Sequence, residues 1–366
     1  MTDSIFSPSF GNKPRVLVGR DQVMQTLVEG LSSYPGSKER ARLIIGQRGL
    51  GKTVLLLELA EVARQQGFIV ASPTVVSNDM LVRILEKLYR SGEKYLSPGK
   101  AKVTGGSFGL FGVSVGIQTD VGEQSEKSFA YQLQTICEQA GKSGKGILIL
   151  VDEVQSGSEE LKKLIIAYQE MVGEGHNIAI VLAGLPSAIS QTLNQHVLTF
   201  MNRASKLHLE PISIREIELY YRNSFEQIGI VLMDDQIKQA AKLTEGSPYM
   251  MQLIGHYIAV SASEHGTITE KAFSQALVVA REEFIEDICG TTLSQLSAKD
   301  IAFLNAMTED EKESSMQNIC QRLKVDSAYA NRYRTRLLQA GIISQSRRGF
   351  VEFAVPYLKD YLLQER

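Results

Sequence analysis

A short stretch, "GQRGLGKT" at residues 46–53, holds residue types that together can bind a phosphate chain. Glycines let the backbone curl so that successive N–H groups point at one anion, and the helix that follows adds its positive end. Lys52 is then expected to bridge the outer two phosphates, while the Thr53 hydroxyl holds Mg²⁺. The spacing predicts a nucleotide-binding loop whose contact residues are Gly46, Gln47, Arg48, Gly49, Leu50, Gly51, Lys52, Thr53 and Val54.

Two adjacent acids, Asp152 and Glu153, follow the apolar run "GILILV". A carboxylate at the end of a neighbouring strand can position the metal, which is the role we expect for Asp152. Glu153 is expected to orient or deprotonate the attacking water. The second acid favours a hydrolase over a protein that only holds nucleotide, and the predicted ligands are ATP or ADP with Mg²⁺.

The elements around these residues predict an α/β core over residues 15–210. The unbroken apolar runs "RLII", "FIVASPTVV", "GILILV" and "NIAIVLA" alternate with helical stretches, as in a parallel sheet covered on both faces. Residues 211–292 contain four segments with an apolar stripe, which predicts a helical lid. Residues 1–14 are predicted to be a polar, mobile lead-in.

The segment 293–366 changes character again. Two helices are predicted in a helix-turn-helix order, the second capped by Asp326 or Ser327 and followed by Gly341. A hairpin with a basic tip, "SQSRRGFVEFAVP", comes next. The region from Ser327 to Val351 holds no acid and five arginines, namely Arg332, Arg334, Arg336, Arg347 and Arg348.

Such a cluster is a local anomaly in a chain of net charge -2. Phosphate neutralisation is its natural use, so these arginines are predicted to bind double-stranded DNA. The alternative is a protein-interaction module whose Arg-rich helix is merely solvated.

An alternating, glycine-rich stretch at residues 102–120 predicts a hairpin inserted in the core. Two interpretations stay open for it: a finger that meets a partner subunit or DNA, or a hairpin packed on its own core.

The composition sets outer limits. A chain of 366 residues predicts two or three domains, and 43% hydrophobic with 22% charged residues is typical of a soluble globular protein. No apolar run reaches the roughly 20 residues of a membrane helix. The start of the chain lacks a secretory signal pattern. Cys137, Cys289 and Cys320 are far apart and form no CxxC pair, so we expect buried thiols in a cytoplasmic protein that binds no membrane.

With these motifs in hand, the chain resembles an AAA-type P-loop ATPase of the origin-recognition and replication-initiator branch, bordering on the STAND signalling ATPases. "LVGRDQVMQTL" resembles the box before the core, which implies that Val18, Gly19 and Arg20 line the adenine side. "FMNRASKLHLEPIS" resembles the arginine-finger segment, which implies that role for Arg203 in a homo-oligomer. "LTEGSPYMMQLIGHYI" resembles the lid motif with Gly246 and Pro248, and the last 74 or so residues resemble a C-terminal winged-helix domain.

The chain departs from that family pattern at two places. The strand "NIAIVLAGLPS" ends in Ala183 and Gly184, where the family has a polar sensor residue, and Ser187 is the nearest hydroxyl. After the lid glycine motif, Tyr249 and Met250 stand where a sensor arginine is usual. These departures predict slow or partner-dependent hydrolysis.

The resulting prediction is an ATP-controlled switch that binds DNA through its winged helix and assembles with or remodels partners. Two alternatives remain: a STAND-like signalling or defence ATPase whose winged helix binds protein, and a nucleotide-locked scaffold with little turnover.

Overall fold

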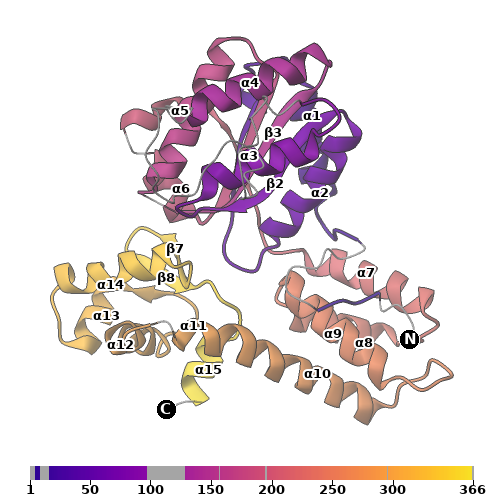
Figure 1. The fold of residues 1–366 in the computed structure, drawn as a ribbon. Coiled ribbons are helices and arrows are strands. Elements are labelled where there is room, and N and C mark those ends of the chain that lie inside the picture. The colour runs from indigo at the N-terminus through magenta and orange to yellow at the C-terminus, as the bar shows by residue number, and fades with distance from the viewer. Residues whose placement is uncertain are drawn as a thin grey trace, which may run out of the picture.

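The computed structural model describes residues 5–8, 16–96, 128–155, 157–193, 196–294 and 296–364. They form three parts: an α/β core, a helical lid and a C-terminal domain (Figure 1). The hairpin predicted at residues 102–120 lies outside the described residues.

The core is built on five parallel strands in the order β2-β3-β4-β1-β5. Their bounds are β1 Ala41–Ile45, β2 Phe68–Val75, β3 Gly146–Val154, β4 Ile178–Gly184 and β5 Ser205–His208. The helices of the core are α1 Asp21–Ser32, α2 Lys52–Gln65, α3 Met80–Ser91, α4 Phe129–Lys142, α5 Glu159–Gly173 and α6 Pro186–Leu193, with short 3₁₀ turns η1 Lys38–Arg40 and η2 His196–Arg203. The predicted parallel α/β core is confirmed.

Both faces of the sheet are buried. Side chains of α3, α4 and α5 pack on one face, and those of α1 and α2 pack on the other. The strands β1 and β4 are buried along their whole length. This double burial explains why those strands read as unbroken apolar runs instead of alternating ones.

Strand β5 was missed as a strand by the pattern of apolar runs. It has only four residues and alternates between half-buried and exposed positions. A short edge strand of this kind resembles a loop in sequence, although it pairs in parallel with β1 over four residues.

The predicted lid consists of α7 Ile214–Gln227, α8 Asp234–Leu243, α9 Pro248–Ser261 and α10 Glu270–Phe284. Beyond α10 the chain continues without a break through a π-helical segment, η3 Ile285–Gly290, into α11 Thr291–Ser294. Ile285 and Cys289 already pack in the hydrophobic cluster of the C-terminal domain. One helical run therefore links the two parts along the bottom of the molecule (Figure 1).

The expectation of a mobile lead-in is wrong for the described part of the N-terminus. Phe6 is 1% exposed and lies among Tyr220, Tyr221 and Phe225 of the lid. A Cβ on Gly255 of α9 would lie 2.1 Å from the Phe6 ring, so glycine leaves the room that the ring fills. The polar composition of the segment concealed one buried aromatic anchor.

We expect the substitution Phe6→Ala to lower the free energy of unfolding by about 3 kcal/mol, because it empties a fully buried site. Urea denaturation of the full chain measures this. Tyr34→Ala is the matched control, since the Tyr34 side chain is 75% exposed. Equal effects of the two substitutions would contradict a structural role for the N-terminal anchor.

The C-terminal domain has the element order helix, strand, two helices and a two-stranded wing. Its bounds are α12 Ala298–Met307, β6 Ser314–Ser315, α13 Met316–Leu323, α14 Ser327–Gln339, β7 Ile343–Arg347, β8 Phe350–Phe353 and α15 Leu358–Gln364. The three strands form an antiparallel sheet in the order β6-β8-β7. Asp326 caps α14 by accepting from the Tyr329 N–H, and Gly341 has φ 67° just after the helix. The predicted winged-helix-like arrangement is present.

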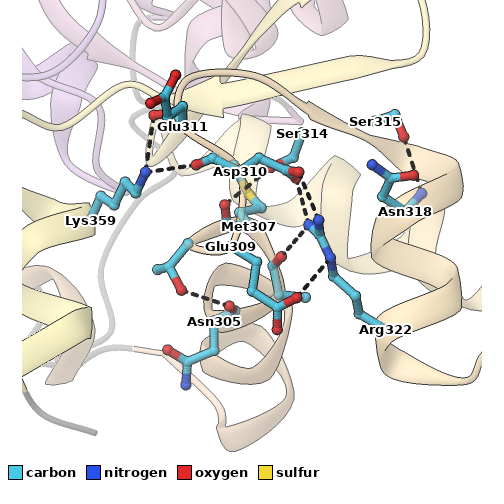
Figure 2. A network of polar contacts seen from close by, with 12 residues as sticks. Asn305, Met307, Glu309, Asp310, Glu311, Ser314, Ser315, Asn318, Arg322 and Lys359 are labelled. Atoms are coloured by element: carbon cyan, nitrogen blue, oxygen red, sulfur yellow. Dashed lines mark hydrogen bonds and ion pairs between the residues drawn. The ribbon is translucent and has the colours of Figure 1, made fainter.

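The loop between α12 and β6 is held from two sides (Figure 2). Arg322 of α13 donates to both carboxylate oxygens of Asp310 and pairs with Glu309 at 3.0 Å. Lys359 of α15 donates to the carbonyl oxygens of Asp310 and Glu311. This network anchors an acidic loop beside the wing. The sequence analysis counted the arginines of this domain and did not predict this loop.

Within the described ranges, no helix combines the length and apolar character needed to cross a bilayer. The three cysteines are free thiols; Cys137 and Cys289 are buried as expected, and Cys320 is only half-buried.

Candidate active site

The predicted phosphate loop connects the buried strand β1 to helix α2. Gly49 and Gly51 have φ 78° and 82°, in the left-handed region that residues with a Cβ rarely adopt, so these two glycines permit the curl. Gly46 lies against Leu209, and a Cβ there would be 3.1 Å from the Leu209 Cβ. The loop leads directly into helix α2, which has 14 residues. The positive N-terminal end of such a helix favours an anion.

Lys52 already spans the loop. Its Nζ donates to the carbonyl oxygens of Gly46 at 2.8 Å and Gln47 at 2.6 Å. Burial lowers the pKa of the Lys52 ammonium to about 8, although the nearby Asp152 and Glu153 carboxylates act in the opposite direction. A phosphate beside this ammonium would favour its charged form.

The acidic pair lies next to the loop, as predicted. The Thr53 hydroxyl donates to Asp152 Oδ2 at 2.6 Å, which joins the start of α2 to the end of β3. Asp152 is 3% exposed, whereas Glu153 is exposed to solvent. Glu153 has φ 51° and sits at an irregularity in the pairing of β3 with β4. This backbone turn buries one carboxylate and presents the other.

The donor set fits Mg²⁺. A hydroxyl and a carboxylate are hard oxygen donors, and Mg²⁺ in nucleotide sites takes one or two protein ligands plus phosphate oxygens and water. Among the described residues no three Asp, Glu, His or Cys side chains gather into a protein-only metal cage. Thr53 and Asp152 would therefore hold the ion together with the nucleotide.

The lid reaches the loop through its predicted motif. A Cβ on Gly51 would lie 3.8 Å from Pro248, the first residue of α9. Gly246 has φ 76°, and its carbonyl oxygen accepts from the Ile212 N–H. The strand-to-lid connection and the lid motif thus stand side by side against the phosphate loop.

A cavity of about 810 Å³ opens between the three parts. This volume is in the range of pockets that bury a cofactor-sized ligand. The phosphate loop and the segment His208–Pro211 form its core side, and the lid contributes Glu245, Ser247 and Tyr249. The wing closes the far side with Ser344, Gln345 and Glu352. Sequence reasoning missed these wing residues, because no local pattern links them to a loop 300 positions earlier.

Val18 and Arg20, which were expected to lie beside the adenine, are buried in the protein interior. Val18 packs with the lid cluster. The Arg20 guanidinium donates to the carbonyl oxygens of Leu50 and Glu210 at 3.2 and 2.8 Å. Arg20 thereby holds the phosphate loop against the end of β5.

Ser187, the nearest hydroxyl to the missing sensor position, points to the C-terminal domain. Its Oγ donates to the Leu338 carbonyl oxygen of α14 at 3.1 Å. On the lid, Tyr249 donates its hydroxyl to Asp287 at 2.6 Å. Ser187 and Tyr249, which stand near the two positions where the chain departs from the family pattern, thus both form hydrogen bonds within the protein.

Comparison with known proteins agrees with this geometry. Residues 16–181 match the family model described as the AAA ATPase domain. This part of the chain is therefore similar to AAA ATPase domains. Residues 286–362 match a second model, described as a domain of unknown function (DUF8462), which covers the winged-helix-like part and begins inside the linking helix. No curated protein matches the chain.

Solved structures share the whole fold. The Aeropyrum pernix ORC2 protein, in ADPNP–ADP complexes, is similar with a TM-score of 0.67 and 16% identity over 98% of this chain and 95% of that one. The Walker-type ATPase Paby2304 of Pyrococcus abyssi gives 0.67 and 16% over 97% and 99%. Cdc6p of Pyrobaculum aerophilum gives 0.51 and 16% over 98% and 96%. The chain therefore shares its fold with these three proteins.

Arg203 lies at the opposite end of the sheet from the phosphate loop of its own chain. It ends η2 and directly precedes β5, whereas the loop follows the opposite end of the adjacent, parallel strand β1. Arg203 is exposed and has no ion pair within the ranges that the structure describes. A finger role for Arg203 would thus require the nucleotide of a neighbouring copy.

The five C-terminal arginines do not form one free cluster. Arg336 pairs with the buried Asp300, Arg347 pairs with Glu313 at 3.1 Å, and Arg334 donates to Gln345. Arg332 and Arg348 are exposed and have no ion pair among the described residues. Lys299, which the sequence reading missed, adds an exposed ammonium 5.6 Å above the Tyr329 ring of α14.

Proposed function

We propose that the chain is an ATP-hydrolysing switch that binds double-stranded DNA through its C-terminal domain and acts as an oligomer or with a partner protein. The observation that carries the ATPase part is the contact between Thr53 and Asp152 with Lys52 and Glu153 beside it. This arrangement supports the proposal that these four side chains bind a polyphosphate and activate water.

Each side chain has a defined part in the proposed reaction. The loop N–H groups and Lys52 bind and orient the phosphate chain. Bound Mg²⁺ would neutralise charge on the phosphate oxygens. Thr53 and Asp152 hold the metal side of the site, and the exposed carboxylate of Glu153 accepts a proton from the attacking water.

The DNA-binding part rests on Arg332 and Arg348, which protrude from α14 and from the wing tip without an acidic neighbour that neutralises them. Arg347 differs, because Glu313 already satisfies it. Released counterions drive such binding, so its strength must fall with salt.

We expect the double substitution Arg332→Ala with Arg348→Ala to reduce the salt slope of duplex DNA binding by about 2, since each phosphate contact contributes about 1. Fluorescence anisotropy with a labelled duplex, at several salt concentrations, measures the slope. Arg347→Ala should change it less. Absence of binding by the unaltered chain at low salt would eliminate the DNA proposal.

The structure also favours a second candidate, a STAND-like switch whose C-terminal domain binds protein. That domain docks on both other parts: Ser187 contacts α14, Tyr357 donates to the Leu243 carbonyl oxygen, and Arg281 pairs with Asp360 at 2.8 Å. A closed, nucleotide-controlled arrangement of this kind needs no DNA. Nucleotide-dependent opening, seen by small-angle scattering in a chain that does not bind duplex, would support this candidate.

A further inference from the structure

A second cavity, of about 300 Å³, separates the tip of the phosphate loop from the C-terminal domain. Its volume is at the lower end for small-ligand sites. Two arginines that the sequence assigned to different ligands, Arg48 and Arg336, both line it. The remaining wall residues are Thr292, Leu296, Ser297, Asp300, Ala340 and Ile342.

Arg336 is held in place by one carboxylate but keeps unused donors. Its Nε donates to Asp300 Oδ1 at 2.8 Å, and its Nη2 contacts Asp300 Oδ2 and Ser297 Oγ. No contact within the described ranges uses Nη1. The Asp300 side chain is 3% exposed and both of its oxygens are occupied, so it has no capacity left for a second arginine.

Arg48 stands on the other side of the cavity, exposed and with no hydrogen bond or ion pair to the part of the chain that the structure describes. The hydroxyls nearby are engaged as donors, because Thr292 donates to Ile288 and Ser297 donates to Asp300. Two guanidinium groups therefore share one small space with a single, already paired carboxylate. The positive charge that remains favours an anion.

We propose that this cavity binds a phosphate-type oxyanion between the guanidinium groups of Arg48 and Arg336, and that the anion ties the tip of the phosphate loop to α14. Guanidinium is the side chain best matched to phosphate oxygens, because its N–H groups form a planar fork. The apolar walls Leu296, Ala340 and Ile342 exclude part of the competing water. Through Arg336, the anion acts on the same helix that carries Arg332.

Two sources have this chemistry. One is the terminal phosphate of a nucleotide in the phosphate loop, in which case the inference rests on the proposed ATPase function. The other is a separate small phosphate compound, for which inorganic phosphate is the probe.

The test uses the full chain and calorimetry. Inorganic phosphate is titrated into protein with and without saturating ADP, and the affinities for ADP and for a non-hydrolysable ATP analogue are compared. Arg48→Ala should weaken, by about tenfold or more, either phosphate binding to the ADP-loaded protein or the preference for the triphosphate. The first result identifies a separate phosphate and the second identifies the terminal phosphate.

Matched variants complete the design. Arg48→Lys keeps the charge but loses the fork, so its loss should be smaller, and Arg64→Ala, an exposed arginine farther along α2, should have no effect. Arg336→Lys combined with Arg48→Ala should cost less than the sum of the single changes, because both contact one anion. If Arg336→Lys fails to fold, as thermal unfolding would show, the Arg48 series decides alone.

Unchanged phosphate binding and unchanged triphosphate preference in Arg48→Ala would overturn the inference. If the unaltered chain binds no nucleotide, the ATPase proposal fails separately, and phosphate titration into the nucleotide-free protein still tests the cavity.

Discussion

Replacing Glu153 with glutamine should lower steady-state ATP turnover by roughly 100-fold or more, because the substitution removes the proposed general base while keeping its size. The exposed position of Glu153, next to the buried Asp152, leaves its carboxylate open to a water molecule. Phosphate release with and without duplex DNA measures the effect. Nucleotide affinity should stay the same, since no hydrogen bond joins Glu153 to the phosphate-loop backbone within the ranges that the structure describes.

The control is Glu159→Gln on α5, where the carboxylate is 72% exposed and pairs with Lys162. Equal and near-zero turnover in the unaltered chain and in Glu153→Gln, under both conditions, would contradict the enzyme and support a nucleotide-locked scaffold.

The substitution Lys52→Ala should weaken ATP binding by about 10- to 100-fold, the usual range for losing hydrogen bonds to a charged group. Lys52 is the cation that crosses the loop, and no other ammonium among the described residues donates to the loop carbonyls. Calorimetric titration of ATP with Mg²⁺ gives the affinity directly.

Lys87→Ala is the matched control, because the Lys87 Nζ also donates to two backbone carbonyl oxygens, at Ser72 and Pro73, but lies away from the loop. That change should leave ATP affinity intact. Indistinguishable titration curves for Lys52→Ala and the unaltered chain would remove the basis for a nucleotide site in this loop.

The phosphate and acidic motifs were predictable because their geometry is local. Gly49 and Gly51 adopt positive φ, which glycine does more readily than any other residue, so the residue type itself predicts the turn. Lys52 and Thr53 follow directly in the sequence. Asp152 and Glu153 could be placed because the strand that precedes them is buried on both faces and reads as an apolar run. The same logic failed for β5, which is short and half-exposed, and for Phe6, whose burial depends on a glycine in a distant helix.

Charge pairing was decided only by the folded chain. The sequence between Ser327 and Val351 contains no acid. From the sequence alone, all five arginines were therefore equally plausible as free, DNA-binding side chains. In the structure, Asp300 and Glu313 come from elements before that segment and occupy Arg336 and Arg347. An ion pair depends on distances in space, and sequence spacing cannot report which distant carboxylate will lie within reach of a guanidinium.

By itself, the sequence determined the nucleotide loop, its acidic partner, the parallel core, the lid and the winged-helix-like end, because each depends on short-range backbone preference and on apolar periodicity. Only the tertiary structure decided that the wing lines the large cavity beside the phosphate loop, that Ser187 contacts α14, and that Arg48 and Arg336 line one smaller cavity. Those relations arise from how the three parts pack against one another, and packing between parts leaves no periodic pattern in the sequence.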